Sequence, residues 1–207
     1  APGFKGSSEA RRKAVENALR DFRLGGAELD EAGRARHAAI REELSALSAK
    51  FSQNVLDATD AWALYVDDEA QLSGLPADVL AACRDAAQRE GREGWKLGLQ
   101  MPVYLAVQSL ADDRELRATL YRANAVRASE LGDDPALDNS TLVDRILALR
   151  AELAALLGFD SYAAYSLATK MADTPDQVQA FLRDLAARAK PHAQRDDKRQ
   201  DNDIVEI

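Results

Sequence analysis

Apolar residues recur every three or four positions along most of this chain, the spacing of one buried face of an α-helix. The pattern is clearest between 139 and 190, where three apolar stripes are separated by two short connections. Gly158 follows the first stripe at the position of a left-handed C-terminal cap, and Thr174-Pro-Asp-Gln177 forms a capping box before the third. We therefore predict helices over 140–157, 160–172 and 175–190, packed into a helical core.

The same spacing predicts five further helices in the first two thirds of the chain. They cover 8–23, 31–58, 76–91, 102–110 and 113–131. Two short segments, near 62–66 and 95–100, instead alternate apolar and polar residues, which is the period of a half-buried strand. Two strands alone are marginally stable, so we expect them to pair and to lie against helices. The predicted fold class is mostly α, with a small two-stranded β element.

The end of the chain has a different character. Pro191 interrupts the last apolar stripe, and residues 192–207 offer almost no apolar side chains for a core. We predict one helical domain over 1–191, followed by a polar, frayed tail over 192–207.

Composition narrows the classes of function. The 207 residues include 27 basic and 35 acidic side chains, a net charge of -8 that works against nucleic-acid binding. No apolar run is long enough to cross a bilayer, and the start lacks a secretion-signal pattern. The one cysteine, Cys83, cannot form an internal disulfide and fits a reducing compartment. We expect a cytoplasmic protein that binds neither nucleic acid nor membrane.

Candidate chemistry is sparse. The only histidines are His37, which lies among arginines, and His192, which follows Pro191; neither belongs to a Glu-x-x-His pattern. Cys83 sits at the apolar spacing of a helix, which favours core packing over nucleophilic catalysis. Glycine-rich phosphate loops are missing. We predict no catalytic residue, no metal ligand and no cofactor in this chain.

Two segments carry a family resemblance. Residues 47–59 and 139–172, above all the run from Ile146 to Tyr162, resemble the oligopeptidase A branch of the thimet oligopeptidase family of zinc metallopeptidases. That family uses a zinc helix with His-Glu-x-x-His and a further glutamate downstream, and the 207 residues contain no such motif. The resemblance therefore implies a noncatalytic part of such an enzyme, inactive alone, with zinc bound elsewhere in the intact parent.

The resemblance also implies a role for this part. In the family, the helical part ahead of the catalytic half forms a wall of a channel that admits short peptides. The predicted strand pair would belong to that wall, where an exposed edge contacts an extended oligopeptide by strand addition. The predicted peptide-binding residues are Trp62, Tyr65, Trp95 and Tyr104. The competing interpretation is that these aromatic side chains only pack against the core.

Two alternatives belong to other classes: a stand-alone helical module that binds peptides or proteins without catalysis, and a remnant that exposes the surface where the catalytic half once packed. Both predict an apolar patch, so its position distinguishes them. A remnant exposes the patch on the helices near 139–190, and would pair there with the missing catalytic half or with a second copy. A module places it in a closed concave groove.

Overall fold

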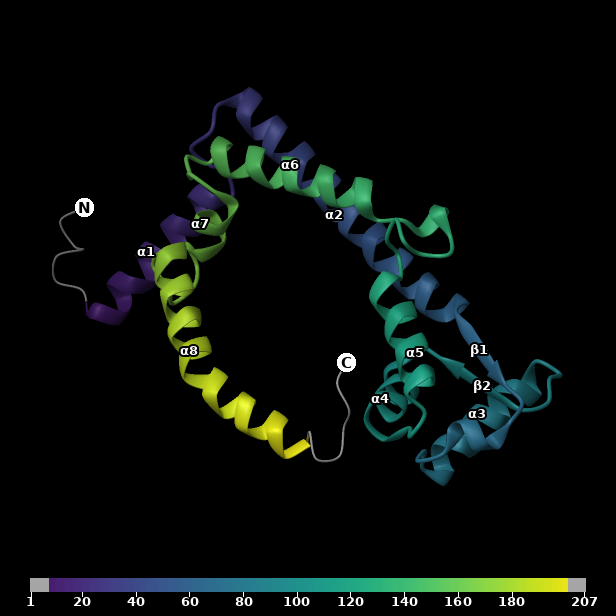
Figure 1. Cartoon of the computed structure of the whole chain (residues 1–207). Coiled ribbons are helices and arrows are strands. Elements are labelled where there is room, and N and C mark those ends of the chain that lie inside the picture. The colour runs from purple at the N-terminus through teal and green to yellow at the C-terminus, as the bar shows by residue number, and fades with distance from the viewer. Residues whose placement is uncertain (1–7, 201–207) are drawn as a thin grey trace. The chain divides into compact units, whose positions relative to one another are not determined.

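The computed structural model describes residues 8–200, which form eight α-helices, two short 3-10 helices and one pair of strands (Figure 1). The helices are α1 (Glu9–Leu24), α2 (Glu31–Ala61), α3 (Ala77–Arg89), α4 (Met101–Leu110), α5 (Arg114–Val126), α6 (Ser140–Leu156), α7 (Tyr162–Leu167) and α8 (Pro175–Gln200). The strands are β1 (Ala63–Val66) and β2 (Trp95–Gly98), and the 3-10 helices are η1 (Glu69–Leu72) and η2 (Pro135–Leu137). The predicted fold class, mostly α with two strands, is confirmed.

The chain divides into two compact units. Unit 1 contains the chain up to Arg41 and from Ala148 onward, and unit 2 contains Glu42–Leu147. The helices α2 and α6 contribute residues to both units. Apolar periodicity does not mark this division, because both helices continue across it.

Unit 2 contains the main hydrophobic core. The two strands pair antiparallel, with Ala63 opposite Gly98 and Val66 opposite Trp95, and α3 packs against β2. The buried side chains of this core come from the strands, η1, α3, α4, α5 and their connections: Val66, Leu72, Leu75, Cys83, Trp95, Leu97, Val107, Ala111, Leu116 and Leu120. The predicted packing role of Cys83 is confirmed, and burial raises the pKa of its thiol.

A buried pair of asparagines joins α2 to the start of α6 within unit 2. Asn54 is 2% exposed and Asn139 is 3% exposed. The side-chain amide of Asn54 donates to Asn139 Oδ1 at 2.8 Å, and the amide of Asn139 donates to the Phe51 carbonyl at 3.1 Å. The backbone N–H of Asn139 donates to the Ala128 carbonyl at 3.1 Å. Asn139 therefore connects α2, the segment after α5 and α6 through one residue.

The Asp138 side chain, two residues before the start of α6, binds the first residue of that helix. Asp138 Oδ1 accepts from the Ser140 N–H at 2.8 Å and from the Ser140 hydroxyl at 2.7 Å. These hydrogen bonds, the hydroxyl first, lower the pKa of the Asp138 carboxyl. Asn139 is thereby free to turn inward toward Asn54.

In unit 1, the apolar faces of two helices, α1 and α8, are exposed. Its buried apolar side chains, among the residues described, are Ile40, Leu149, Leu153 and Ala154. By contrast, Phe22 on α1 is 68% exposed, and Phe181 and Leu182 on α8 are 64% and 54% exposed. The prediction that 175–190 packs into a helical core is therefore wrong, because within unit 1 no described element covers the apolar face of α8; the apolar face of α1 is exposed in the same way.

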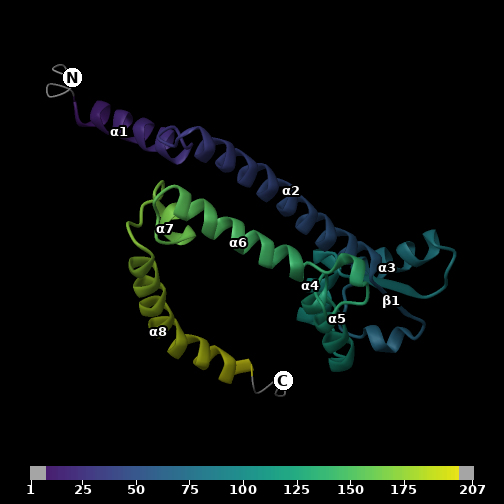
Figure 2. The same cartoon turned by 90° about the horizontal axis from the view of Figure 1, so that it is seen from above.

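One ion pair in each unit joins α2 to α6, which lie side by side in both views (Figures 1 and 2). In unit 1, Arg36 binds Glu152 through two hydrogen bonds of 2.5 and 2.6 Å. In unit 2, Arg145 binds Glu43 through two of 2.6 and 2.8 Å. Each pair is partly exposed and adds at most about 1 kcal/mol, so it specifies which helix faces pair more than it stabilises them.

The connection between α6 and α7 contains the left-handed glycine cap predicted at Gly158. Gly158 adopts φ 78°, and the Phe159 N–H donates back to the Ala154 carbonyl at 2.8 Å, as in a left-handed C-terminal cap. The Ser161 hydroxyl then caps α7 by accepting from the Ala164 N–H at 3.1 Å. The turn is as predicted, but α7 ends at Leu167 and is shorter than the predicted helix over 160–172.

The last helix departs further from its prediction. The helix α8 begins at the predicted proline, and the Thr174 hydroxyl caps it by accepting from the Gln177 N–H at 3.2 Å. It then continues through Pro191 to Gln200, so the predicted end of the helix at Pro191 is wrong, whereas the fraying of the polar tail stays a prediction. Proline removes one N–H donor and its ring crowds the carbonyl four residues earlier, which kinks a helix interior or ends it; here the helix continues past it. The remainder of the predicted tail, 201–207, lies outside the described residues.

The asparagine pair predicts a large effect of one substitution. Asn139→Ala leaves the Asn54 amide and the Phe51 carbonyl buried without these partners, so we expect a loss of about 2–3 kcal/mol in unfolding free energy. Urea unfolding followed by circular dichroism measures it. The control is Gln53→Ala, which changes an exposed neighbour of Asn54 and should cost less than about 0.5 kcal/mol. Equal midpoints for the two variants would contradict the role of Asn139.

Candidate functional site

The four predicted peptide-binding residues lie in unit 2 around the strand pair, in different environments. Trp95 is only 5% exposed and belongs to the core, with the Arg84 guanidinium 4.5 Å from its ring centroid. This position argues against Trp95 as a peptide contact. Trp62, just before β1, and Tyr104, on α4, are half-buried and pack against the same core, while Tyr65 is half-buried on β1.

Tyr65 is part of a polar cluster at the surface of the strand pair. Its hydroxyl donates to the Glu90 carboxylate, which also accepts from the ammonium of Lys96, the residue opposite Tyr65 on β2. The Arg92 guanidinium lies 4.0 Å from the centroid of the Tyr65 ring, within cation–π range. The cluster therefore holds Tyr65 in one orientation along the strand.

The cluster shifts the pKa values of two members in opposite directions. Hydrogen bonds from Lys96, first, and from Tyr65 lower the pKa of the Glu90 carboxyl, because both stabilise its charged form. The hydrogen bond to Glu90 is also the main cause that raises the pKa of the Tyr65 phenol, since a phenolate would face a carboxylate. Tyr65 is thus a neutral hydrogen-bond donor at neutral pH.

The strand β1 has a partner on one side only. It pairs with β2, and no third strand occurs within residues 8–200. In the same part of the chain, no turn or loop hydrogen bond involves the backbone of Ala63–Val66. The outer edge of β1 thus presents the unpaired backbone groups that an added strand would need.

A pocket of about 300 Å³ adjoins Trp62. Its walls come from the end of α2, the start of β1, the residue after β2, and the segment from α5 to η2: Ala58, Ala61, Trp62, Ala63, Leu99, Ala123, Val126, Arg127, Ala128, Gly132, Asp133, Asp134 and Leu137. Alanine and glycine make up much of this lining, and their small side chains leave the space open. The pocket combines an indole, apolar walls and charged groups of both signs.

One wall of this pocket depends on residues that sequence reasoning did not select. Ala128 is buried and has φ 52°, an unusual value for a residue with a side chain. Its carbonyl accepts the N–H of Asn139, which fixes the segment in place. The sequence offered one indication of this arrangement, because Asn54 is a polar residue on the apolar face of α2. A polar side chain buried there requires a hydrogen-bond partner.

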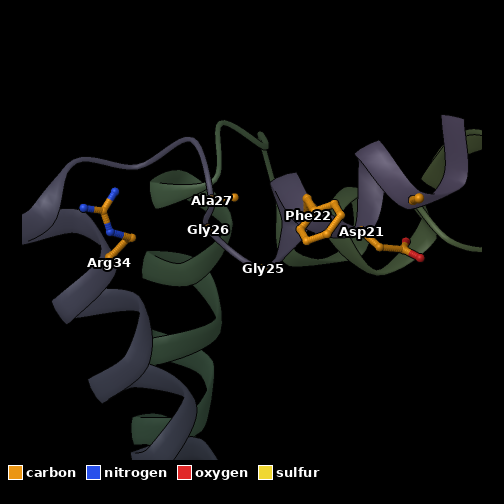
Figure 3. A pocket seen from close by; sticks show the side chains of 7 residues that line it. Asp21, Phe22, Gly25, Gly26, Ala27 and Arg34 are labelled. Atoms are coloured by element: carbon orange, nitrogen blue, oxygen red, sulfur yellow. The ribbon is translucent and has the colours of Figure 1, made fainter. Parts of the chain in front are cut away.

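A second pocket, of about 390 Å³, lies in unit 1 at the turn between α1 and α2 (Figure 3). Figure 3 shows Arg34 on one side of the Gly25–Ala27 turn, and Phe22 and Asp21 on the other. Both charged side chains are already engaged, since Asp21 pairs with Arg20 at 2.8 Å and Arg34 donates to the Leu29 carbonyl. This open pocket therefore lacks free polar groups to recognise a ligand.

The residues of this chain do not fit the zinc site of a peptidase. Within residues 8–200, no group of three histidine, cysteine, aspartate or glutamate side chains is arranged to hold a metal ion. His37 lies on α2 beside the Gly26 turn, and its Nε2 is buried without a hydrogen-bond partner in the described structure. His192 lies on α8. A catalytic zinc requires three protein ligands and an open position.

Sequence comparison shows which known proteins this chain resembles. The sequence profile that describes Peptidase family M3 matches residues 107–202 of this chain. Oligopeptidase A of Haemophilus influenzae is 46% identical over 194 residues, which are 93% of this chain and 28% of that protein. The oligopeptidases A of Salmonella typhimurium and Escherichia coli are 47% and 48% identical, each over 90% of this chain and 28% of the relative. These matches support an oligopeptidase A-like fragment of peptidase family M3.

The family resemblance inferred from 47–59 and 139–172 is thereby confirmed. This M3 chain spans about 28% of the length of the three relatives it matches. It is therefore comparable with one segment of an oligopeptidase A and not with the whole protein. In the described part of the M3 chain, no helix is both long and apolar enough to span a membrane.

The Glu90 cluster predicts a pH dependence. Because the folded pKa of Glu90 is lowered, its contribution to stability is present above the unfolded pKa, about 4.3, and is lost as pH falls through the folded value. Carboxyl carbon NMR should give a Glu90 midpoint below 4.3, and Lys96→Met should raise it. Lys50→Met, far from the cluster in sequence, should leave it unchanged. A Glu90 midpoint unaffected by Lys96→Met would rule out the stated cause.

Proposed function

We propose that this chain is a noncatalytic segment of an oligopeptidase A-like zinc peptidase and forms part of the channel wall that admits short peptides. One observation supports this proposal most strongly. About nine tenths of this chain matches oligopeptidase A, yet the chain has no His-Glu-x-x-His motif. In this proposal, zinc and the water-activating glutamate belong to the longer protein. The single cysteine supports a cytoplasmic location.

The position of the exposed apolar side chains supports this proposal over a stand-alone module. Val143 and Leu147 on α6 are 40% and 56% exposed, and Leu185 extends the exposed stripe of α8 at 51%. These helices lie in the 139–190 region where a surface that covers another part of the protein was expected. In the proposal, the catalytic half packs on these side chains, and a second copy of the chain is the alternative partner.

The strand pair supplies the peptide-binding part of the proposal. The free edge of β1 offers backbone groups to an extended peptide; Trp62 directly precedes this strand, and Tyr65 lies within it. The Glu90 cluster holds the Tyr65 ring in one orientation before a peptide binds. Tyr104, which is half-buried, remains a proposed peptide contact. Trp95 does not, because it is buried in the core.

The noncatalytic assignment has a direct test. The purified chain, supplied with zinc and an internally quenched fluorescent peptide, should give no more turnover than buffer, because a water-activating metal cage needs residues it lacks. Escherichia coli oligopeptidase A, assayed in parallel, verifies the substrate. Turnover by the chain that a chelator abolishes would overturn the assignment.

The channel-wall role requires the longer protein. A chimera in which this chain replaces the matching segment of the Haemophilus influenzae oligopeptidase A should hydrolyse the same peptide. In that chimera, Trp62→Ala with Tyr65→Ala should raise KM about tenfold and change kcat little, because substrate binding and not chemistry is lost. Tyr121→Ala, which removes an exposed aromatic ring on α5, is the matched control. An unchanged KM in the double variant would refute the role of β1.

A further inference from the structure

The side chains that line the pocket beside Trp62 can recognise a small ligand. Its volume, about 300 Å³, is at the lower end of the range for small-molecule sites. Small side chains of α2, β1 and α5 leave this space open, and the indole of Trp62 forms an aromatic wall. Such walls favour a small apolar body, while polar groups at the rim fix its orientation.

Two charged groups of the lining have no partner among residues 8–200. Arg127 follows α5, and Asp133 lies six residues later in the segment toward η2; no hydrogen bond or ion pair of either side chain occurs in the described structure. The neighbouring Asp134 is different, since its Oδ1 accepts the Ala136 N–H at 2.9 Å as the cap of η2. The lining thus offers one free guanidinium and one free carboxylate.

We infer that this pocket binds a zwitterionic dipeptide. Arg127 receives the α-carboxylate, for which the planar fork of a guanidinium is suited, and Asp133 receives the α-ammonium. The apolar side chain of the dipeptide packs on Trp62 and the alanines. The inference rests on the proposed function, because a segment of an oligopeptide-cleaving protein is exposed to short peptides with free termini, and it adds a site for them in this segment.

The charge pattern selects this class of ligand over others. A phosphate or nucleic-acid strand would use Arg127 but would be repelled by Asp133 and Asp134. A purely apolar ligand would offer no hydrogen-bond partner to the Arg127 guanidinium or to the Asp133 carboxylate. A ligand that carries both signs satisfies both groups at once.

The two tryptophans provide a direct measurement. Trp62 lines the pocket, whereas Trp95 is buried in the core, so the chain gives two indole N–H signals, one a probe and one an internal control. Titration with L-alanyl-L-leucine, followed by ¹H–¹⁵N NMR, should shift the Trp62 signal saturably and leave the Trp95 signal in place. Trp62→Phe assigns the signals.

Dipeptides with a capped terminus test each charge of the ligand, and variants of Asp133 and Arg127 test each charge of the pocket. N-acetylation or C-amidation of the dipeptide should weaken binding about tenfold each, and so should Asp133→Asn and Arg127→Gln, since each removes one charge-assisted hydrogen bond. Asp144→Asn on α6 and Arg122→Gln on α5 make the same chemical changes on exposed residues outside the pocket and should bind normally.

The outcomes separate this inference from the proposed function. A Trp62 signal that does not shift at millimolar dipeptide in the folded chain overturns the inference, as does equal binding of a dipeptide capped at both ends. Neither result depends on the peptidase assays, which measure turnover. Conversely, chelator-sensitive turnover would overturn the noncatalytic assignment and leave the dipeptide titration unaffected.

Discussion

The buried hydrogen bonds of Asn139 hold unit 2 in its arrangement. A buried asparagine must satisfy its amide, and Asn139 does so by bonding Asn54 and the Phe51 carbonyl of α2, while its N–H bonds Ala128. These bonds fix the start of α6 against α2. They also hold the Ala128 backbone in its unusual conformation, and through it a wall of the Trp62 pocket. The same inward turn removes Asn139 from solvent, so the Asn139-Ser-Thr sequon is not available for glycosylation in the folded chain.

The two units bury their apolar residues to different extents, which bears on function. Unit 2 closes a core around β2, with α3, α4 and α5. In unit 1, amphipathic helices form and are capped correctly, but the apolar stripes of α1 and α8 remain exposed. Helical periodicity requires a covering surface without specifying which element provides it. This difference fits the proposal that exposed apolar side chains of this segment pack on the rest of an M3 peptidase.

The surface of the strand pair is organised by charge. Glu90, Lys96 and Arg92 surround Tyr65, and Arg84 covers Trp95, so cations lie over two aromatic rings of the same small sheet. These contacts leave the outer edge of β1 free. A wall that binds the backbone of extended peptides would accept many sequences, because strand addition relies on main-chain groups. The pocket at Trp62, in contrast, offers discrimination through side-chain charge.

Local sequence determined the helices, the strand pair, the Gly158 and Thr174 caps and the family, because each depends on spacing or on residues close in the chain. It also determined that the chain lacks a peptidase zinc motif. Only the tertiary structure decided that Trp95 is buried, that α8 passes Pro191, and that Asn54 meets Asn139 across 85 positions. The pocket of Trp62, Arg127 and Asp133 likewise exists only after folding, because long-range packing and not periodicity brings α2, β1 and the segment after α5 together.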